Sequence, residues 1–421
     1  RERWPEGELA VECFYVAGRE ARYLVEPGKL QEAVRTADVA VIDTMGASEK
    51  LQETVRVALE RCEGERIVIG NTLREYLRLG SFSMAAMRKS RKKKEAKTEE
   101  GQKQKGNALD KMHKMRRMAL MLGNVLPFGV TRDMKNVFLL IDYWQQATQE
   151  DISSFFYLLL RQYGKQKFLP KEKPCTMEYG IYLKDPDTLE CCPGVTEYWE
   201  KRKYQKEKDT VALLFYGHSY PNDFLPIVRA IMRELERRYN ILPVAFSQNE
   251  DGDLEKLEEI VCQNISPVAA VINLMPFRLG AGPMGGDAKR AVEILERADV
   301  PYLKPFCLTK VTQDEWKNSA GVNPGEFLIS ILLPELDGGI LSMPVGVMGE
   351  TEDGELPQLI PEKERIHTLG KRLDGLVNLQ KKRNAEKKVA IIFYNYPPGE
   401  SNVFGGAFLD TFASASRLLE G

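Results

Sequence analysis

Short apolar runs alternate along much of the chain with stretches whose apolar residues recur at every third or fourth position. The first pattern predicts buried β-strands and the second predicts amphipathic α-helices. The clearest series predicts strands over 211–216, 242–246 and 268–274, with helices over 224–235 and 254–262 between them. Because each strand–helix–strand step needs a crossover connection, the series predicts parallel strands in an α/β sheet.

The stretch 271–340 extends this series and contains two turns rich in glycine. Its pattern predicts one more helix over 287–297 and one more strand over 301–306. The first turn, 280–285, follows a predicted strand, and the second, 334–339, reads PELDGG. Open α/β sheets bind ligands in loops at the carboxyl ends of their strands, so both turns are candidate binding surfaces.

The same patterns divide the chain into predicted domains. The N-terminal part, 1–80, is predicted to be a small α/β unit with strands over 9–16, 39–43 and 67–70 and helices over 27–36 and 49–60. The predicted parts after it are a basic flexible loop over 81–107, a helical region over 108–163, an irregular linker or cover segment over 164–209, a central α/β domain over 210–388 and the truncated start of a further α/β domain over 389–421. The predicted fold class is therefore α/β, with several flavodoxin- or Rossmann-like parallel-sheet units and an inserted helical region.

Composition narrows the classes of function. The 421 residues are 43% hydrophobic and 29% charged, as in ordinary globular proteins, and the net charge of −1 provides no overall attraction for nucleic acid. No apolar run approaches the roughly 18 residues that span a bilayer, so no transmembrane segment is expected. Seven cysteines without a CxxC pair, together with three widely separated histidines, favour a cytoplasmic protein with reduced thiols and no metal site.

The strongest local charge lies in residues 88–105, which hold nine Lys or Arg and three Glu. This composition predicts a solvated, partly disordered loop, with a nucleic-acid or anionic-lipid contact as the alternative. No aromatic residues are interleaved with the charges, so the stacking contacts of a nucleic-acid site are missing. In the helical region that follows, Met112, Met115 and Met118 recur at helical spacing, which we interpret as core packing.

The first candidate site is the turn 280–285, GAGPMG, which matches the G-x-G-x-x-G pattern of dinucleotide-binding loops. The loop around it is longer than the tight turn of those proteins, and Pro276 and Pro283 remove backbone N–H donors from it. We therefore favour a loop whose glycines, Gly282 among them, allow close approach of a flat ligand or of another backbone. A nucleotide-dependent oxidoreductase or transferase is the alternative function.

The second candidate site is the turn 334–339. Its two carboxylates, Glu335 and Asp337, could bind a cation or take part in proton transfer. The favoured interpretation is a turn in which Asp337-Gly338 supplies a position with positive φ and Glu335 bonds a nearby backbone N–H.

The third candidate site is the loop 395–402, which follows a predicted strand over 389–394 and precedes a glycine-rich helix start. The amino end of that helix would offer free N–H groups and a positive dipole end to an anion such as a carboxylate. A rigid connection that serves only packing is equally compatible with its prolines.

Longer motifs in the same stretches resemble one known family. They are Gly282-Pro283, Asp287, 291–293 (AVE), 299–302 (DVPY), 316–319 (WKNS), Gly321, Pro324 and 333–338 (LPELDG), with 79–84 (LGSFSM), Tyr143-Trp144 and 396–402 (YPPGESN) elsewhere. In this order and spacing they resemble the large subunit of tetrapyrrole metal chelatases, which comprise the large subunits of magnesium chelatase and of cobaltochelatase. The resemblance extends over essentially the whole chain.

The resemblance implies a ligase that inserts Co²⁺ or Mg²⁺, as substrate ion, into a porphyrin or corrin-type tetrapyrrole, while separate AAA+ subunits hydrolyse ATP. The chain contains no P-loop sequence, which agrees with ATP being used by partner subunits and not bound here. The stretch 282–337 looks more like the magnesium type and 409–414 more like the cobalt type. Cobalt insertion in cobalamin biosynthesis is favoured, with Mg²⁺ insertion into protoporphyrin IX as the alternative.

The resemblance also implies which residues contact the ring, and it leaves the catalytic residues unassigned. The implied substrate-binding residues are Gly282, Pro283, Glu335, Tyr396, Pro398, Glu400 and Asn402, whereas Asp337 is expected to be structural. Family large subunits are much longer, so this chain is expected to be an N-terminal fragment. Their metal-insertion residues lie mostly beyond position 421, and the fragment alone is expected to be inactive. A non-catalytic α/β binding module that docks a partner through its basic loop is the remaining alternative.

Overall fold

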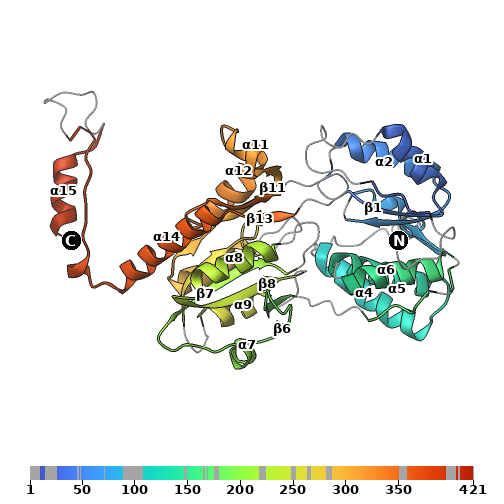
Figure 1. The fold of residues 1–421 in the computed structure, drawn as a ribbon, viewed down its shortest axis with the longest axis horizontal. Helices are drawn as coiled ribbons and strands as arrows, with labels where there is room; N and C mark the ends of the chain where they lie inside the picture. Colours follow the sequence, from blue (N-terminus) through green and yellow to red (C-terminus); the bar gives the residue numbers. More distant parts are fainter. Residues whose placement is uncertain are drawn as a thin grey trace, which may run out of the picture. The chain divides into compact units, whose positions relative to one another are not determined.

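The computed structural model forms two compact units, 1–373 and 374–421, which are described separately. It describes the whole chain apart from residues 1–9, 15–25, 45–46, 48, 71, 89–107, 147–148, 165, 168, 175–179, 218–223, 248–252, 263–266, 281–286, 350–357, 395–403, 406–407 and 421. The fold class is α/β, as the sequence predicts: parallel-strand sheets are packed against helices (Figure 1).

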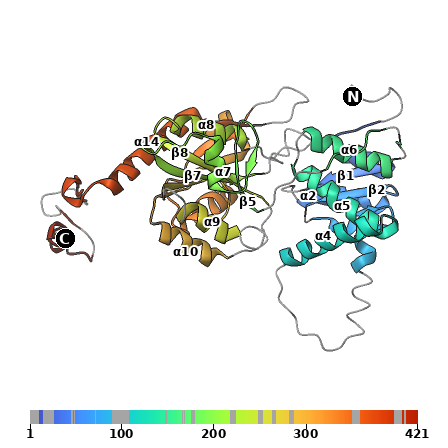
Figure 2. The same ribbon diagram turned by 90° about the horizontal axis from the view of Figure 1, so that it is seen from below.

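The largest sheet has six strands in the order β10-β9-β7-β8-β5-β6. Its parallel part consists of β7 (Asp209–Tyr216), β8 (Tyr239–Phe246), β9 (Val268–Asn273) and β10 (Tyr302–Leu303). The connecting helices are α8 (Leu225–Leu235), α9 (Asp253–Cys262) and α10 (Ala288–Ala298), with α8 on one face and α9 and α10 on the other (Figure 2). The predicted series of parallel strands is thereby confirmed.

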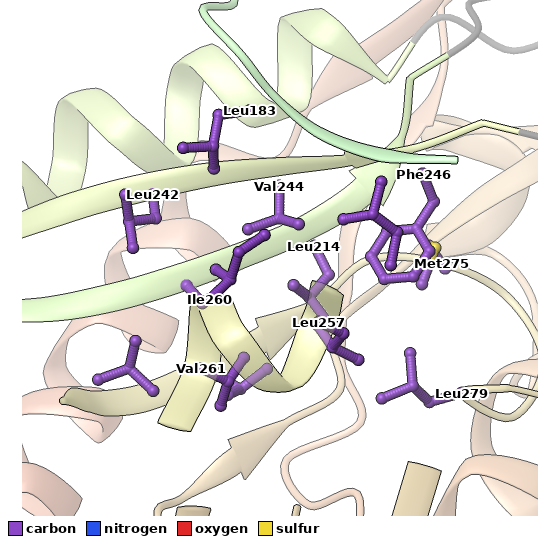
Figure 3. Packing of buried hydrophobic residues seen from close by; sticks show 14 of the residues in the cluster. Leu183, Leu214, Leu242, Val244, Phe246, Leu257, Ile260, Val261, Met275 and Leu279 are labelled. Atoms are coloured by element: carbon purple, nitrogen blue, oxygen red, sulfur yellow. The ribbon is translucent and has the colours of Figure 1, made fainter. Parts of the chain in front are cut away.

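The core of this sheet explains why its strands are almost entirely apolar in sequence. A strand covered by helices on both faces buries every side chain, so its sequence does not alternate. All eight side chains of β8 are buried, and those of β7 are buried except at its two ends. Side chains of α9 pack against the face of the sheet that α9 and α10 cover. The residues of this core that Figure 3 labels include Leu214, Leu242 and Val244 on the strands and Leu257, Ile260 and Val261 on α9.

The segment 164–209 contributes two short strands to the same sheet and contains one helix, so the prediction that it is irregular is wrong for these three elements. β5 (Ile181–Lys184) pairs antiparallel with β8, and β6 (Cys191–Cys192) pairs antiparallel with β5. The helix α7 (Val195–Lys201) follows. The two strands are too short to show a pattern: β5 is stabilised by pairing with β8, far along the chain, and β6 by pairing with β5.

The expected strand over 301–306 is divided between two sheets. β10 ends at Leu303, and β11 (Phe306–Thr312) belongs to a three-stranded sheet with β12 (Pro344–Met348) and β13 (Leu359–Pro361). Pro305 lies between them and has no N–H to continue a ladder. The elements between β11 and β12 are α11 (Gln313–Lys317), α12 (Pro324–Phe327), the π-helix η2 (Leu328–Leu332) and α13 (Leu333–Glu335).

The N-terminal part of the first unit contains a second sheet with its own helices. Its sheet contains the parallel pair β1 (Val39–Asp43) and β2 (Glu65–Ile69) and the short strands β3 (Arg78–Leu79) and β4 (Phe82–Ser83), with the turn η1 (Arg74–Tyr76) before β3. The helices α1 (Pro27–Thr36) and α2 (Glu49–Arg61) form one core with β1. The helices α4 (Ala108–Val125), α5 (Gly129–Gln146) and α6 (Gln149–Gln162) form another core with β2, β3 and β4. The inserted helical region therefore covers the second face of this sheet (Figure 1).

Three expectations for this region need correction. Residues 10–14, within the predicted strand 9–16, have no regular structure. In α4, Met115 packs against the core, but Met118 is exposed, so the core-packing interpretation fails for Met118. Residues 82–88 of the expected basic loop form β4 and a helical turn, and the loop from residue 89 on lies outside the described residues.

The second unit begins inside α14 (Lys363–Lys381) and contains the turn η3 (Asn384–Glu386) and α15 (Thr411–Glu420). The predicted strand 389–394 has no strand pairing among the described residues. A single strand is not stable without a neighbour, however apolar its sequence. Val389 and Ile392 are accordingly exposed.

The motif at 79–84 has a structural explanation in the β3–β4 turn. Gly80 has φ +54°, and a Cβ there would lie 2.5 Å from Oδ2 of Asp133. Asp133 is fully buried and accepts hydrogen bonds from the Ser81 backbone N–H (2.7 Å) and the Tyr163 hydroxyl (2.7 Å). Only glycine fits between this turn and α5, because the turn needs both a left-handed backbone and close approach.

We expect Gly80→Ala to lower the free energy of unfolding by about 3 kcal/mol, since it adds strain at positive φ to the loss of the Ser81–Asp133 bond. Gly129→Ala is the matched control, because Gly129 has a similar φ of +57° but no atom within 4 Å of an added Cβ. Its expected cost is about 1 kcal/mol. Urea denaturation, with amide hydrogen exchange in β2 and α5, measures both. Equal losses would contradict the packing role of Gly80.

Candidate functional site

The candidate site lies at the carboxyl ends of β9 and β10, where the loop 274–280 meets the turn 334–340. Asn273, the last residue of β9, is fully buried. Its Nδ2 donates to the Tyr302 hydroxyl (2.7 Å), and its Oδ1 accepts the Met275 backbone N–H (2.8 Å). The amide therefore fixes both the first residues of the loop and the neighbouring strand.

Lys304 is a fully buried cation beneath this loop. Its Nζ donates to the carbonyl oxygen of Met275, and its backbone N–H donates to the carbonyl of Ile340 (2.8 Å). Burial lowers the pKa of Lys304 to about 8, and burial also raises the pKa of the nearby Cys307 thiol to about 12. Lys304 thus links the start of the loop to the end of the turn, at the residue where the chain leaves the large sheet.

Asp337 makes the second link between the loop and the turn. Its carboxylate is fully buried and accepts hydrogen bonds from Arg278 Nε (2.7 Å) and the Leu279 backbone N–H (3.0 Å). Arg278 also places its terminal nitrogen 2.6 Å from the same carboxylate. Because each oxygen of the carboxylate is bonded inside the protein, the structure supports the structural role expected for Asp337.

The turn interpretation of 334–339 is confirmed, with one difference in detail. Gly338 has φ +80°, the position that Asp-Gly was expected to supply. The carboxylate that bonds a backbone N–H is that of Asp337, whereas the Glu335 side chain is exposed at the end of α13. Glu335 therefore presents a carboxylate to solvent beside the rigid turn.

Glu335 is the one predicted ring-binding residue that the structure describes. Gly282, Pro283, Tyr396, Pro398, Glu400 and Asn402 lie outside the described residues, and their roles stay predictions. Gly280, the first glycine of the G-x-G-x-x-G match, has φ +71°, and a Cβ there would lie 2.7 Å from the carbonyl oxygen of Asp287. Close packing against the start of α10 accounts for this glycine without a nucleotide.

Beside Glu335 lies a stripe of exposed apolar side chains that was not predicted. Leu328, Leu332 and Leu336 follow one another at intervals of four residues, and Leu336 is 61% exposed. The loop holds this stripe in place, because the Phe277 backbone N–H donates to the carbonyl of Ile329 (3.3 Å) in the π-helix η2. We call the side chains Phe327, Leu328, Leu332, Leu336 and Ile340 the apolar stripe; all are exposed.

The spacing of the apolar stripe is visible in the sequence, but Pro334 within it argues against a helix. A spacing of four is typical of one face of a helix, and proline normally ends a helix. Here Pro334 lies in α13, which continues directly from the π-helix η2, and the Leu333 N–H donates to the carbonyl of Leu328, five residues back. The π-helix before it is a feature often found at functional sites.

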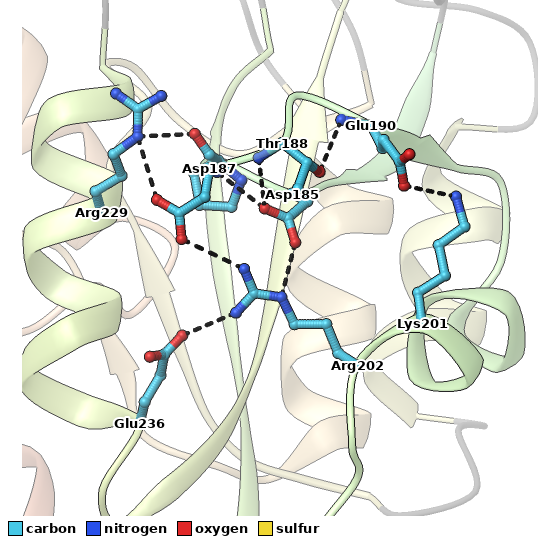
Figure 4. A network of polar contacts seen from close by, with 9 residues as sticks. Asp185, Asp187, Thr188, Glu190, Lys201, Arg202, Arg229 and Glu236 are labelled. Atoms are coloured by element: carbon cyan, nitrogen blue, oxygen red, sulfur yellow. Dashed lines mark hydrogen bonds and ion pairs between the residues drawn. The ribbon is translucent and has the colours of Figure 1, made fainter.

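A separate ion-pair network ties the β5–β6 hairpin to α7 and α8 (Figure 4). The Asp185 carboxylate accepts hydrogen bonds from the backbone N–H groups of Asp187 and Thr188. It also accepts one from Arg202 Nε, at 2.7 Å. Although burial acts to raise it, these bonds keep the pKa of Asp185 below its usual range. Arg202 also reaches Glu236 (3.1 Å). Each charged side chain of the network has a partner of opposite charge within it, which favours a structural role over a catalytic one.

Two findings concern the described part of the chain as a whole. No helix in it is both long and apolar enough to cross a membrane. Among the residues with described positions, no three His, Cys, Asp or Glu side chains come together in a way that could hold a metal ion.

Fold, motifs and buried contacts define a class of α/β protein in which the loop 274–280 and the turn 334–339 are joined by buried hydrogen bonds at the carboxyl ends of the strands. The match to known proteins identifies the family: the model of the CobN/Magnesium Chelatase family matches residues 141–421, and the chain belongs to this family.

Several curated relatives are similar to this chain. The H-type magnesium-chelatase subunit of Chlorobaculum parvum is 28% identical over 338 residues, 75% of this chain and 25% of the relative. The chloroplastic magnesium-chelatase subunit ChlH of Oryza sativa subsp. indica is 26% identical over 437 residues, 94% of this chain and 30% of the relative. The aerobic cobaltochelatase subunit CobN of Pseudomonas aeruginosa is 28% identical over 287 residues, 66% of this chain and 22% of the relative.

Among solved structures, the catalytic subunit of cobaltochelatase from Mycobacterium tuberculosis is similar, with a TM-score of 0.48 and 17% identity. It is matched over 87% of this chain and 26% of its own. The chain therefore spans only about a quarter to a third of the length of these relatives.

Removing Asp337 should be far more costly than removing its exposed neighbour Glu335. We expect Asp337→Ala to lower the free energy of unfolding by about 3–5 kcal/mol, because it leaves Arg278 and the Leu279 N–H without their buried partner. Glu335→Ala, the matched control, should change it by less than about 0.5 kcal/mol. Urea denaturation of both variants measures the difference. If Asp337→Ala lowered the free energy of unfolding no more than Glu335→Ala does, the carboxylate would not be holding the turn.

The buried Lys304 predicts a pH dependence of stability. Its pKa is about 8 in the folded protein and 10.5 in the reference state, so between these values the unfolded chain binds more protons. Stability from this group should therefore rise with pH through that window, by about 3 kcal/mol in total.

The comparison variant is Lys304→Met, which keeps the volume and removes the charge. The stability of the wild type minus that of the variant should rise between pH 8 and 10.5. The raised pKa values of Cys307 and Tyr302 act in the opposite direction in both proteins, so they largely cancel in the difference. Denaturation curves measured across this range provide the test, and a flat difference would contradict the lowered pKa.

Proposed function

We propose that this chain is part of the large, ring-binding subunit of a tetrapyrrole metal chelatase, a ligase that forms nitrogen–metal bonds. The family match over 141–421 carries the proposal, because it includes both glycine-rich turns and the segment 396–402. The buried contacts of Asp337 and Lys304 support it, since they give the matched turns a rigid base. AAA+ subunits are the proposed partners, and they hydrolyse the ATP.

The apolar stripe and Glu335 are the surface that we propose for the ring. A tetrapyrrole has a broad apolar face, which favours contact with exposed Leu and Phe side chains on a rigid element. Gly282 and Pro283 follow Phe277 and Arg278 in the sequence, and they are proposed as ring contacts on the resemblance alone. Tyr396, Pro398, Glu400 and Asn402 are proposed as further ring contacts on the resemblance alone.

The chemistry of insertion explains what the carboxylates of Glu335 and Glu400 would do. In the course of insertion the metal ion must lose bound water, and the two N–H nitrogens of the ring must each lose a proton to a base before they can bind the metal. Glu335 and Glu400 would offer weak oxygen ligands to the incoming substrate ion or accept a proton. We assign no catalytic residue, and the insertion step is proposed to need the rest of a longer subunit, so that the fragment alone is inactive.

Cobalt is the proposed substrate metal, with a corrin-type ring of cobalamin biosynthesis and a cytoplasmic location. The stretch 409–414, which resembles the cobalt type, supports this choice. Mg²⁺ insertion into protoporphyrin IX is the second candidate, favoured by the rice relative, which aligns with 94% of this chain. The nucleotide-dependent enzyme is not favoured, because Gly280 is explained by packing against α10.

Ring binding should quench the tryptophan fluorescence of the chain. We expect saturable quenching on titration with micromolar hydrogenobyrinate diamide, with protoporphyrin IX as the comparison ring. Leu336→Asp should weaken binding about tenfold, because it places a charge on the apolar stripe. Leu189→Asp, at another exposed leucine, is the matched control.

Tight binding of NADH with no response to either ring would overturn the proposed function. Quenching that Leu336→Asp leaves unchanged would keep the function and reject the apolar stripe as the contact surface.

A further inference from the structure

The corner between α4 and α5 exposes a concentrated group of apolar side chains. Val125 is 72% exposed, Phe128 66% and Met121 61%, which are high values for such residues on a helical layer. We call the side chains Met118, Met121, Val125, Leu126, Phe128 and Val130 the corner patch; all are exposed.

The corner patch points away from the core on an ordered framework. In α4, Ala119 is fully buried and Met115 packs against the core, whereas Met118, Met121 and Val125 share the opposite face at helical spacing. The turn itself is fixed by hydrogen bonds: Thr131 Oγ1 donates to the carbonyls of Leu126 (2.5 Å) and Phe128 (2.9 Å).

Within residues 114–135, the exposed charge beside the corner patch is of one sign. Lys114 and Arg117 are exposed on the same face of α4 as Met118 and Met121. The one carboxylate within residues 114–135 is Asp133, which is fully buried and bonded. Within residues 114–135 the surface therefore combines exposed apolar side chains with cations and has no exposed carboxylate.

We propose that the corner patch docks on the surface of an anionic lipid bilayer. Apolar side chains at a helix corner enter the boundary between headgroups and acyl chains, while Lys and Arg beside them contact lipid phosphates. The sequence just before α4 is also rich in cations, which favour anionic lipid: residues 88–105 carry nine Lys or Arg against three Glu. The contact is peripheral, and it is independent of ring binding.

A protein partner would need an apolar groove with an acidic rim, and this occupant is the alternative outcome of the test. The bilayer is favoured because the patch ends in a turn, with Leu126 and Phe128 exposed at its tip. Side chains of a turn can enter a bilayer without matching the shape of a surface, whereas binding in a protein groove requires that the two surfaces match in shape.

The test is sedimentation of the full chain with vesicles of phosphatidylcholine containing about 30% phosphatidylglycerol, at about 0.1 M salt. We expect the chain to bind these vesicles and not vesicles of phosphatidylcholine alone. Lys114→Glu with Arg117→Glu should weaken binding more than tenfold, at about fivefold for each cation lost. Met121→Ser with Phe128→Ser should weaken it at least tenfold.

The matched control exchanges the same kinds of exposed residues elsewhere: Leu379→Ser with Lys371→Glu on α14 should leave binding unchanged. Circular dichroism checks that every variant keeps its helices. Absence of binding to anionic vesicles would overturn the proposal, as would vesicle binding that survives Met121→Ser with Phe128→Ser. Binding to an acidic helical peptide without binding to vesicles would assign the surface to a protein partner and also overturn it.

Discussion

The buried carboxylate of Asp337 is the contact on which the candidate site depends. It joins Arg278 and the Leu279 N–H on one loop to a turn far along the chain, and Lys304 adds a second link between the same segments. A buried charge is costly unless it is paired and hydrogen-bonded, so these partners must stay in place for the fold to be stable. The loop and the turn are therefore held as one rigid body beside the sheet.

This arrangement separates the residues that support the fold from those that face solvent. Gly280 and Asp337 meet needs of packing and charge inside the protein, whereas Glu335 and the apolar stripe face solvent. A rigid base with an exposed apolar surface suits a large flat ligand, because little order is lost when the ligand binds. The proposed ring contact follows from this division between buried support and exposed surface.

The sequence predicts most of the central sheet, because β7 and β9 are continuous apolar runs separated by amphipathic helices. It fails for β5 and β6, since strands this short depend on pairing with β8. The strand expected over 389–394 has an apolar sequence but no neighbour in the described chain. The structural role of Asp337 was anticipated; its partners Arg278 and Leu279 were not, because nothing local in a sequence shows a contact across 58 positions.

The central claim is that this chain belongs to the part of a metal chelatase that holds the ring. The most direct measurement is metal insertion by a large subunit that contains this chain, with the proposed AAA+ subunits and ATP, followed through the absorbance of the ring. The account predicts an ATP-dependent spectral change with Co²⁺ and hydrogenobyrinate diamide, lost when the large subunit is omitted. Insertion of Mg²⁺ into protoporphyrin IX instead would contradict the choice of metal, and no insertion of either ion would contradict the account itself.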